Sequence, residues 1–447
     1  MPNFPKYESY KDNGIEWLGE IPQHWKIQSL NSILVNRNEK NDPVKTKNIL
    51  SLSIANGVTP YSDENRGGNK ANSDLTAYKL AYPGDIVLNS MNVVVGAVGL
   101  SEYFGAISPV YYALNLRIKE KNDIRFFDYI FKNSSFQRYL FQYGKGILFH
   151  KSDSGKLNTI RMKISIQDLK KVPLPLPPLE EQNRIVEFLD RTTAEIDRAI
   201  AQKQRLIELL QEQKAILINQ AVTKELNPNV PMRDRSIEWI GEIPEHWDVK
   251  RLRYIGSCQN GISQSADYFG FGYPFVTYTD VYANLELPKI VSGLANSTNQ
   301  DRRKYSVQRG DVFFTRTSET VEEIGISSTC FNTIKDATFS GFLIRFRPVP
   351  DLIVPEFSKY YFRCQLHRFF FVKEMTLVTR ASLSQELLKK LPVLLPPIEE
   401  QTAISNDIQI KEKLIDDVIF TVNQQIEKLK EYKQLLIANA ITGKIKV

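Results

Sequence analysis

The residues of this chain that could carry out acid–base or nucleophilic chemistry do not form a known catalytic pattern. No HExxH motif, GxSxG motif or cysteine–histidine pairing accompanies its four histidines. His24 and His246 stand beside Trp25 and Trp247 in a string that occurs twice, which indicates packing or capping rather than catalysis. The histidines are His24, His150, His246 and His367.

The sequence also lacks clear motifs for phosphate binding and for metal-dependent catalysis. A phosphate loop needs Ser or Thr after Gly-Lys, but Leu follows Lys156 and Ile follows Lys444. Asp351, Glu356 and Lys359 resemble a metal-nuclease signature only loosely, because the spacing is ExxK and Asp351 lies among prolines. The Pro-Pro-aromatic tetrapeptides typical of amino-methylating enzymes are absent. The sequence therefore predicts a protein that is not an enzyme and has neither a metal nor a cofactor of its own.

The composition is that of a soluble protein with a basic balance. Cys258, Cys330 and Cys364 show no CxxC spacing, so we expect reduced thiols in the cytoplasm. No apolar run approaches the roughly 18 residues of a membrane helix. The net charge is +7; residues 1–179 hold 23 basic and 16 acidic side chains, and residues 226–398 hold 21 and 18. A basic excess in two large segments favours a polyanionic partner.

The sequence contains an internal repeat, so its structural elements are expected to occur in two copies in the same order. GIEWLGEIPQHW at 14–25 recurs as SIEWIGEIPEHW at 236–247, with nine of twelve positions identical. RMKISIQDLKKVPLPLPPLEEQ at 161–182 recurs as RASLSQELLKKLPVLLPPIEEQ at 380–401. The order is kept while the offset drifts, which indicates a duplication with altered loop lengths. The largest change is an inserted loop in the first copy, before Arg161.

Each copy contains a mixed globular region, so we expect an α+β fold. The segments 49–54, 113–118 and 342–347 alternate apolar and polar residues, as half-buried strands do. The aromatic segments 127–141 and 357–371 have bulky residues on more than one face. We expect these two segments to be core helices packed on a sheet rather than platforms for base stacking.

Each copy ends in a long helix. PPLEEQ and PPIEEQ are strong helix starts, because proline is tolerated in the first turn and glutamate favours the positive end of the helix dipole. We expect the first helix to run to about residue 224 and the second to end at Gly443. Eight of eleven a and d positions in each helix are apolar, which predicts an antiparallel coiled coil between them. Two amphipathic helices that each cover their own globular region are the alternative.

The heptad positions predict the core of this helix pair. The residues predicted to form this core are Leu189, Ile196, Ile200, Ile207, Leu210, Leu217, Ile408, Ile415, Ile419, Val422, Ile426, Leu429 and Leu436. At roughly 1.5 Å per residue, such helices span about 60 Å. Two similar but non-identical basic modules on a stiff spacer would measure a fixed distance between two targets.

The whole chain resembles the specificity subunit of type I restriction–modification systems. The resemblance rests on the Leu-Pro-Pro-(Leu/Ile)-Glu-Glu-Gln starts, the Glu-Trp-(Leu/Ile)-Gly-Glu-Ile-Pro strings and the Ala-(Val/Ile)-Thr that closes each long helix. It implies a non-catalytic, sequence-specific subunit that binds double-stranded DNA, with two α/β target-recognition domains separated by two long antiparallel helices. It also implies two DNA methyltransferase subunits and restriction/translocase subunits as partners, and these would bring S-adenosylmethionine, ATP and Mg.

By this resemblance the chain has an internal pseudo-two-fold repeat. Its parts are an N-terminal conserved segment (1–25), target-recognition domain 1 (26–178), a central long helix (179–225), a repeated conserved segment (226–247), target-recognition domain 2 (248–396) and a C-terminal long helix (397–447). The two recognition domains differ in sequence, so we expect an asymmetric, bipartite DNA site with one domain on each half.

Contacts with phosphates need Lys, Arg or small polar donors, and base reading needs polar side chains on loops that reach a groove. In the first domain the candidates are Arg66, Asn69, Lys70, Asn89, Ser90, Asn92, Lys145, His150, Lys151, Lys156 and Arg161. In the second they are Asn260, Ser263, Gln264, Ser265, Tyr278, Thr279, Arg302, Arg303, Lys304, Thr315, Arg316, Thr317 and Arg380. Arg161 and Arg380 are equivalent in the repeat, and a structural role fits them equally well.

Three other classes of protein stay open at this point, and one of them is an enzyme with an unrecognised site, which metal-dependent cleavage by the chain alone would favour. A coiled-coil adaptor would bind proteins through the same helices, and a standalone regulator would bind DNA without a methyltransferase. Duplex binding that needs a split sequence excludes the adaptor. Methylation that occurs only when the chain and a methyltransferase are both present excludes the regulator.

Overall fold

The structure, a computed structural model, shows two units. It describes residues 4–62, 74–91, 96–147, 150–151, 157–158, 161–224, 226–227, 229–234, 240–318, 323–374 and 381–447. Unit 1 consists of residues 1–203 and 423–447, and unit 2 of residues 204–422. Each unit holds half of α5 (Leu179–Lys224) and half of α11 (Ile398–Ile441), so the predicted bounds of both long helices are confirmed.

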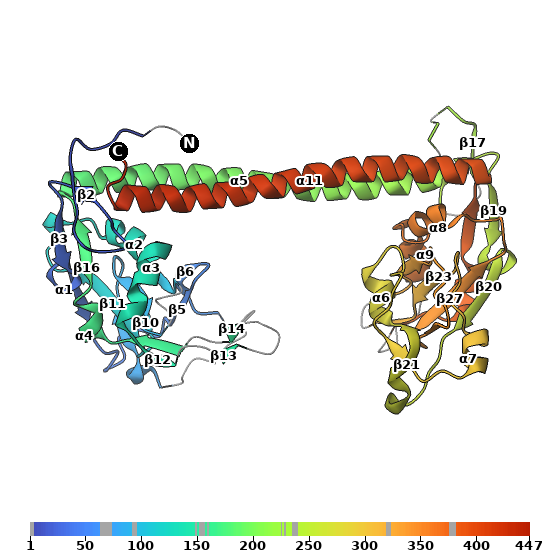
Figure 1. The fold of residues 1–447 in the computed structure, drawn as a ribbon, viewed down its shortest axis with the longest axis horizontal. Helices are drawn as coiled ribbons and strands as arrows, with labels where there is room; N and C mark the ends of the chain where they lie inside the picture. Colours follow the sequence, from blue (N-terminus) through green and yellow to red (C-terminus); the bar gives the residue numbers. More distant parts are fainter. Residues whose placement is uncertain are drawn as a thin grey trace. The chain divides into compact units, whose positions relative to one another are not determined.

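A four-stranded antiparallel sheet with the same strand order forms the centre of each unit (Figure 1). In unit 1 the order is β4 (Leu34–Arg37), β11 (Tyr111–Leu116), β8 (Ile86–Asn89) and β9 (Val98–Leu100). In unit 2 it is β20 (Gly256–Asn260), β27 (Leu343–Pro348), β23 (Val312–Thr315) and β25 (Ser327–Thr329). The two central pairings match, because Ile86 pairs with Leu114 and Val312 pairs with Phe346.

Shorter elements complete each unit. In unit 1 they are β1 (Tyr10–Lys11), β2 (Ile21–Pro22), β3 (Lys26–Ser29), α1 (Leu30–Ile33), β5 (Leu50–Ser53), β6 (Gly57–Pro60), β7 (Lys79–Ala81), β10 (Gly105–Ile107), α2 (Ile124–Lys132), α3 (Ser134–Tyr139), β12 (Gly144–Ile147), β13 (His150–Lys151), β14 (Leu157–Asn158), β15 (Arg161–Ile164), α4 (Ile166–Leu169) and β16 (Pro173–Leu176). In unit 2 they are β17 (Met232–Asp234), β18 (Glu242–Pro244), β19 (Asp248–Arg251), β21 (Phe269–Val276), α6 (Tyr278–Ala283), β22 (Leu294–Ala295), α7 (Asn299–Lys304), β24 (Thr317–Ser318), β26 (Thr338–Phe339), α8 (Pro355–Tyr361), α9 (Leu366–Glu374), β28 (Ala381–Ser382), α10 (Gln385–Lys390) and β29 (Pro392–Leu395). The strands predicted at 49–54, 113–118 and 342–347 are present.

The aromatic segments are core helices, as predicted. Phe127 of α2 shares one buried cluster with Ile86 of the sheet, and Phe357 of α8 shares another with Val312. The first segment breaks into α2 and α3 at Asn133, whose side chain accepts from the next backbone N–H groups and so starts a new helix. Burial of these rings against the sheet holds each long helix beside its globular region.

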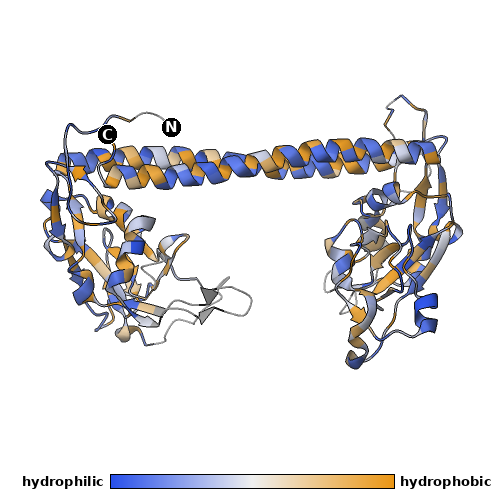
Figure 2. Ribbon diagram, in the orientation of Figure 1, coloured by the Kyte–Doolittle hydropathy of each residue, from blue (hydrophilic) through white to orange (hydrophobic). Residues whose placement is uncertain are grey.

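The two long helices pack antiparallel within each unit. In unit 1 the first half of α5 lies beside the second half of α11, and in unit 2 the remaining halves lie together. Every apolar seam position named above is buried or half-buried, and orange and blue residues alternate along both helices in Figure 2. Lysines at seam positions reach the other helix: Lys214 Nζ lies 2.9 Å from Asp416, and Lys433 Nζ lies 2.7 Å from Asp197. These two ion pairs are equivalent in the repeat.

The repeated Trp- and His-containing string joins each globular region to a long helix. Trp25 Nε1 donates to Glu181 at 3.0 Å, and His24 Nε2 lies 2.8 Å from the same carboxylate. Trp247 Nε1 and His246 Nε2 contact Glu400 in the same way, at 2.9 and 2.8 Å. The histidines therefore bind the first turn of each long helix.

The first copy of the string also lies against the end of α11. Gly443 has a φ of 71°, and a side chain on it would meet Pro22 and Trp25. The N–H of Lys446 donates to the carbonyl of Pro5 at 2.8 Å. The buried members of the two strings in the described residues are Trp17, Leu18, Ile21, Pro22, Trp25, Ile240, Ile243, Pro244 and Trp247, and Trp239 lies outside those residues.

Candidate nucleic-acid interface

An aspartate fixes the start of the central strand in each unit. Asp85 accepts from the N–H of Tyr82 at 2.9 Å, and Asp311 accepts from the N–H of Gln308 at 2.7 Å. An arginine of the same sheet pairs with each carboxylate, Arg37 of β4 with Asp85 at 2.8 Å and Arg347 of β27 with Asp311 at 2.6 Å. These contacts fix where β8 and β23 begin. Because both strands have four residues, their far ends lie at equivalent positions of the two sheets.

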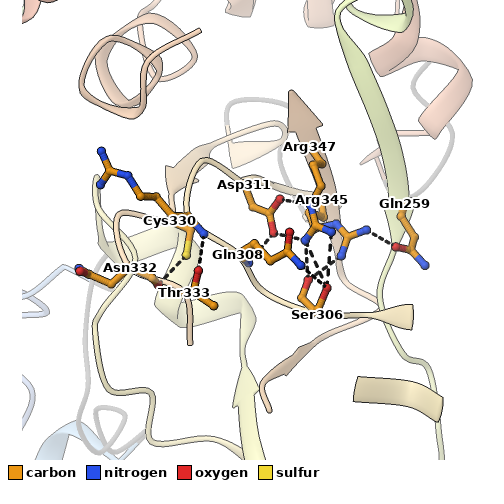
Figure 3. A network of polar contacts seen from close by, with 10 residues as sticks. Gln259, Ser306, Gln308, Asp311, Cys330, Asn332, Thr333, Arg345 and Arg347 are labelled. Atoms are coloured by element: carbon orange, nitrogen blue, oxygen red, sulfur yellow. Dashed lines mark hydrogen bonds and ion pairs between the residues drawn. The ribbon is translucent and has the colours of Figure 1, made fainter. Parts of the chain in front are cut away.

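In unit 2 a second arginine is buried beside this pair (Figure 3). Arg345 donates to the carbonyl of Ser306 at 2.6 Å and to the side chain of Gln259. Burial, followed by the nearby charge of Arg347, lowers the pKa of Arg345 to about 10. The network holds β20, β27 and the turn before β23 together, so these arginines stabilise the sheet and are not presented to a partner.

The far ends of β8 and β23 have the same backbone surroundings. The N–H of Ser90 donates to Val110 O, and the N–H of Arg316 donates to Phe342 O. The N–H of Ile164 donates to Ser90 O at 3.0 Å, and the N–H of Leu383 donates to Arg316 O at 2.7 Å. We call this region the strand-end edge: residues 89–91, 109–110 and 161–164 in unit 1, and residues 315–317, 341–342 and 381–383 in unit 2.

The side chains at the strand-end edge differ between the units. Ser90 is buried in unit 1, whereas its counterpart Arg316 is only partly covered in unit 2. One Nη of Arg316 lies 3.4 Å from Gly341 O, and its Nε is buried without a hydrogen-bond partner. Beside it, Phe342 is 60% exposed. The edge in unit 2 therefore presents a cation and an aromatic ring at one place.

Two of the predicted contact residues are not exposed, so the expectation that they lie on open loops is wrong. Ser90 is 1% exposed and Thr315 is 0% exposed. Thr315 Oγ1 donates to Glu323 O and accepts from the N–H of Ile326, so it fastens a turn. Asn89 is half-buried and accepts from the N–H of Met91. These residues stop the strand and turn the chain.

Unit 1 has Ser90 at the position of Arg316 and places lysines nearby, on β12 and β15. Lys145 of β12 stands directly opposite Lys163 of β15, and both are exposed. Asp168 lies 3.6 Å from Lys145 Nζ. The pKa of Lys79 is lowered, first by burial and then by the charge of Lys163. Like charges directly opposite each other on a sheet destabilise it, so this lysine cluster suits a polyanion that neutralises it.

The predicted insertion is a β-hairpin and not an irregular loop. The register that pairs Lys145 with Lys163 continues outward without a shift, since His150 pairs with Asn158 and Lys151 with Leu157. Antiparallel pairing satisfies backbone N–H and C=O groups of the described residues of this segment. For His150, Lys151 and Arg161 the structure describes the backbone only.

A Gly-rich loop of unit 2 lies against the strand-end edge. Ile262 bridges Ser340, and the N–H of Gly341 donates to Ile262 O at 2.7 Å. A side chain on Gly261 would meet Ser340 O at 2.2 Å, so this close approach requires glycine. The candidates Ser263, Gln264 and Ser265 are exposed on this loop, and Asn260 ends the adjoining strand β20.

The basic cluster of α7 is partly internal. Arg302 stacks over the ring of Tyr273 at 3.6 Å and donates to Ser297 O, with 11% of its side chain exposed. It therefore anchors α7 to β21, while Arg303 and Lys304 are exposed. In α6, Tyr278 stacks on Tyr282 and Thr279 is exposed.

Several candidates cannot be placed, and the sequence reasoning missed others. Arg66, Asn69, Lys70, Asn92, Lys156 and Arg380 lie outside the described residues. Lys79, Lys163 and Phe342 were missed, because each lies in or beside a strand and not in an evident polar loop. The alternation of Arg161 and Lys163 in RMKI was the available signal for Lys163. Thr317 pairs with Ser382 at the strand-end edge.

Metal ligands, reactive thiols and long apolar helices would mark other kinds of site in the described part of the chain. It contains no group of three or more His, Cys, Asp or Glu side chains placed to hold a metal ion. None of the three cysteines, all of them described, forms a disulfide, and burial raises the pKa of each thiol to about 12. None of the described helices is long and apolar enough to cross a membrane.

Known proteins match both halves of the chain. Residues 22–209 and 244–430 match the family model described as type I restriction modification DNA specificity domain. The specificity subunit of the type I restriction enzyme EcoKI from Escherichia coli K12 is 24% identical over 300 residues, 65% of this chain and 62% of that subunit. The match thus spans less than two thirds of that relative. A putative MjaX specificity subunit from Methanocaldococcus jannaschii is 24% identical and is covered to 98%, by 99% of this chain.

Two solved structures share the fold. One, from work on assembly and conformational transition of the type I R-M system, has a TM-score of 0.66 and 16% identity, and the match covers 94% of this chain and 98% of that one. The HsdS subunit from Thermoanaerobacter tengcongensis has a TM-score of 0.54 and 14% identity, with coverage of 95% and 98%. At these identities the likeness concerns the fold alone.

Proposed function

The chain belongs to the type I restriction modification DNA specificity family, and from this premise we propose that it selects the DNA site of a type I restriction–modification complex. Residues 26–178 and 248–396 would be the two target-recognition domains, each bound to one half of an asymmetric, interrupted site. Methylation and cleavage would belong to partner subunits, two methyltransferases and the restriction/translocase subunits. S-adenosylmethionine, ATP and Mg would act there, in the cytoplasm.

The observation that carries this proposal is the strand-end edge. Two units with the same backbone frame hold lysines in one case and Arg316 with Phe342 in the other. Phosphate contacts need cations, and base reading needs a different set of side chains for each sequence. A duplicated frame with diverged side chains is what two different half-sites require.

The geometry supports direct roles for a few residues. Lys145 and Lys163 would contact phosphates, because they are exposed, adjacent and of like charge. Arg316 would read a base edge, because its side chain is only partly covered and its hydrogen bond to Gly341 O engages one Nη. Gln264 and Ser263 on the neighbouring loop would extend the same contact. Arg303 and Lys304 would add phosphate contacts further along.

Mapping of methylated adenines tests the proposal. The chain is expressed with its methyltransferase in a host without other adenine methylation, and single-molecule sequencing locates the modified bases. We expect one asymmetric bipartite motif with an unread gap of about 5–8 bp, since modules on one side of DNA lie about one helical turn apart. Methylation that is independent of the chain, or a continuous palindromic motif, would contradict the proposal.

A further inference from the structure

In unit 2 a segment of the chain covers the outer edge of the sheet. The N–H of Thr329 in β25 donates to Leu285 O at 3.1 Å, and the N–H of Leu287 donates to Thr329 O at 2.9 Å. Glu286 bridges Thr329 in parallel orientation. Residues 285–287 thus add a short strand to β25.

Lys359 of α8 and Arg363, two residues beyond the end of that helix, hold this segment in place. Lys359 Nζ lies 2.6 Å from the carboxylate of Glu286. One Nη of Arg363 donates to Asn284 O at 3.1 Å and to Val281 O at 3.2 Å. The segment is therefore fixed by backbone pairing along the strand and by charge from the helix.

Unit 1 contains the same strand and the same helix. Leu100 of β9 pairs with Ile86 as Thr329 of β25 pairs with Val312. The helices α2 and α8 also correspond, because Gln182 accepts from the N–H of Asp123 and Gln401 accepts from the N–H of Val354, each at 3.0 Å. This alignment makes Asp128 the counterpart of Lys359 and Lys132 the counterpart of Arg363.

The place filled in unit 2 is a groove of about 940 Å³ in unit 1. In the described residues, β9 pairs only with β8, and no strand covers its outer edge. The groove is lined by Val98, Leu100, Asp128, Lys132, Asp190 and Ile437, among others. The turn between β5 and β6 borders it, with Ile54 64% exposed.

The charge that pairs with Glu286 in unit 2 is reversed in unit 1, because Asp128 stands in the place of Lys359. Asp128 is 7% exposed, and its Oδ1 has no hydrogen-bond partner. Its other oxygen lies 2.5 Å from Lys132, so the two counterparts of the gripping residues pair with each other. A buried carboxylate oxygen without a partner favours a cationic donor. Where unit 2 sets Glu286 against Lys359, an occupant of unit 1 would set a Lys or Arg against Asp128.

We propose that this groove binds an extended segment of a partner protein, which pairs with the outer edge of β9 and places a Lys or Arg, flanked by apolar residues, beside Asp128. Strand addition of this kind draws affinity from the backbone and specificity from the side-chain pockets. The segment 285–287 of the same chain is the template for the occupant. This inference goes beyond the proposed function, and the outcome of the methylation mapping does not depend on it.

Two peptides test the groove directly. One has the sequence ANLELPK of residues 283–289, and the other carries Glu286→Arg. We expect the arginine peptide to slow amide hydrogen exchange of residues 98–100 in the full chain and the native peptide to have no effect. Asp128→Asn should weaken the arginine peptide about tenfold or more, because a charged hydrogen bond is lost. Exchange of residues 327–329 in unit 2 is the internal control.

The assembled complex tests the natural occupant. Amide exchange of residues 98–100 is compared between the chain alone and its complex with the methyltransferase, with and without the restriction subunit. A photo-reactive residue in place of Ile54 should cross-link to one extended partner segment that contains a Lys or Arg. Slow exchange already in the chain alone would show that the chain fills the groove itself. That result, or failure of both the arginine peptide and the partners to slow exchange, would overturn the proposal.

Discussion

At the scale of the residue, the two units differ where their backbones agree. Ser90 and Arg316 make the same backbone hydrogen bonds, yet one side chain is buried and the other reaches the surface. Lys145 and Lys163 stand directly opposite each other on paired strands. A carboxylate oxygen of Asp168 lies 3.6 Å from Lys145 Nζ. Such positions are free to change because the fold depends on their backbone and not on their side chains.

Arg316→Ala should weaken binding to the half-site of unit 2. If the guanidinium is bidentate to a guanine, the loss is about 1–3 kcal/mol and the preference at that base relaxes. The measurement is the affinity of the complex with the methyltransferase for duplexes that vary the mapped site, at fixed salt. Arg253→Ala, an exposed arginine outside the strand-end edge, is the matched control. Equal affinity of Arg316→Ala and the native chain would remove Arg316 from base reading.

Lys163→Ala should weaken DNA binding and stabilise the protein. Loss of one phosphate contact lowers affinity for all sequences alike and reduces the slope of log K against log salt by about 1. Relief of repulsion between Lys163 and Lys145 should raise the free energy of unfolding by about 0.2–1 kcal/mol. Salt titrations and urea unfolding of the same preparation measure the two effects. A parallel loss of stability would instead mean a structural role for Lys163.

At the scale of the element, two kinds of contact attach the long helices. The first turn of each helix binds the Trp and His of the repeated string through Glu181 or Glu400. The seam between the helices contains Lys214 and Lys433, which each pair with an aspartate of the opposite helix. Polar residues at seam positions fix register at a cost in stability, and in a chain with two similar halves that register decides which half-helices meet.

Glu181→Ala should destabilise unit 1 more than Glu400→Ala destabilises unit 2. The side chain of Glu181 is 6% exposed and also accepts from Tyr7, whereas that of Glu400 is 28% exposed. The first change leaves buried donors unpaired and should cost about 3 kcal/mol, and the second about 1–2 kcal/mol. Amide exchange in each unit during urea unfolding separates the two effects. Equal losses would show that burial of the carboxylate does not matter.

Lys433→Met should stabilise the helix pair in unit 1. The lysine side chain is 25% exposed at a seam position, and its ion pair with Asp197 lies near the surface. An apolar side chain of similar length should bury more surface and raise the melting temperature by a few degrees. Lys214→Met is the matched change in unit 2. A fall in melting temperature for both variants would show that the ion pairs contribute more than the apolar contacts.

At the scale of the whole molecule, a duplication within one chain gives two related modules whose side chains can change independently. Backbone equivalences run through the sheet, the strand-end edge, the repeated string and the seam ion pairs. The differences concern side chains at the edge, the hairpin inserted in unit 1 and the segment that covers β25 in unit 2. One scaffold thus holds two different binding surfaces.

One additional heptad in α5 and one at the equivalent level of α11 should lengthen the unread gap of the DNA site. Seven residues add about 10 Å at roughly 1.5 Å per residue, which corresponds to about 3 bp, and a whole heptad keeps the seam in phase. Methylation mapping of the lengthened protein measures the gap. An insertion of seven residues in α5 alone is the control, because it breaks the pairing. An unchanged gap in the protein with both insertions would show that the helices do not set the spacing.

The sequence by itself determined the duplication, both long helices and the strands β11 and β27 of the central sheets, because these follow from local periodicity, proline punctuation and repeated motifs. It also indicated where the repeated string would lie, since the second copy directly follows the first helix.

Only the tertiary structure decided which polar residues reach the surface. Ser90 and Thr315 belong to types that contact DNA, but strand ends from distant parts of the sequence close over them. Lys79 and Lys163, far apart in the chain, come together because β15 crosses the end of β8. The open groove of unit 1 likewise depends on which segment covers a strand edge. Burial and neighbourhood are set by long-range packing, and local residue patterns do not contain that information.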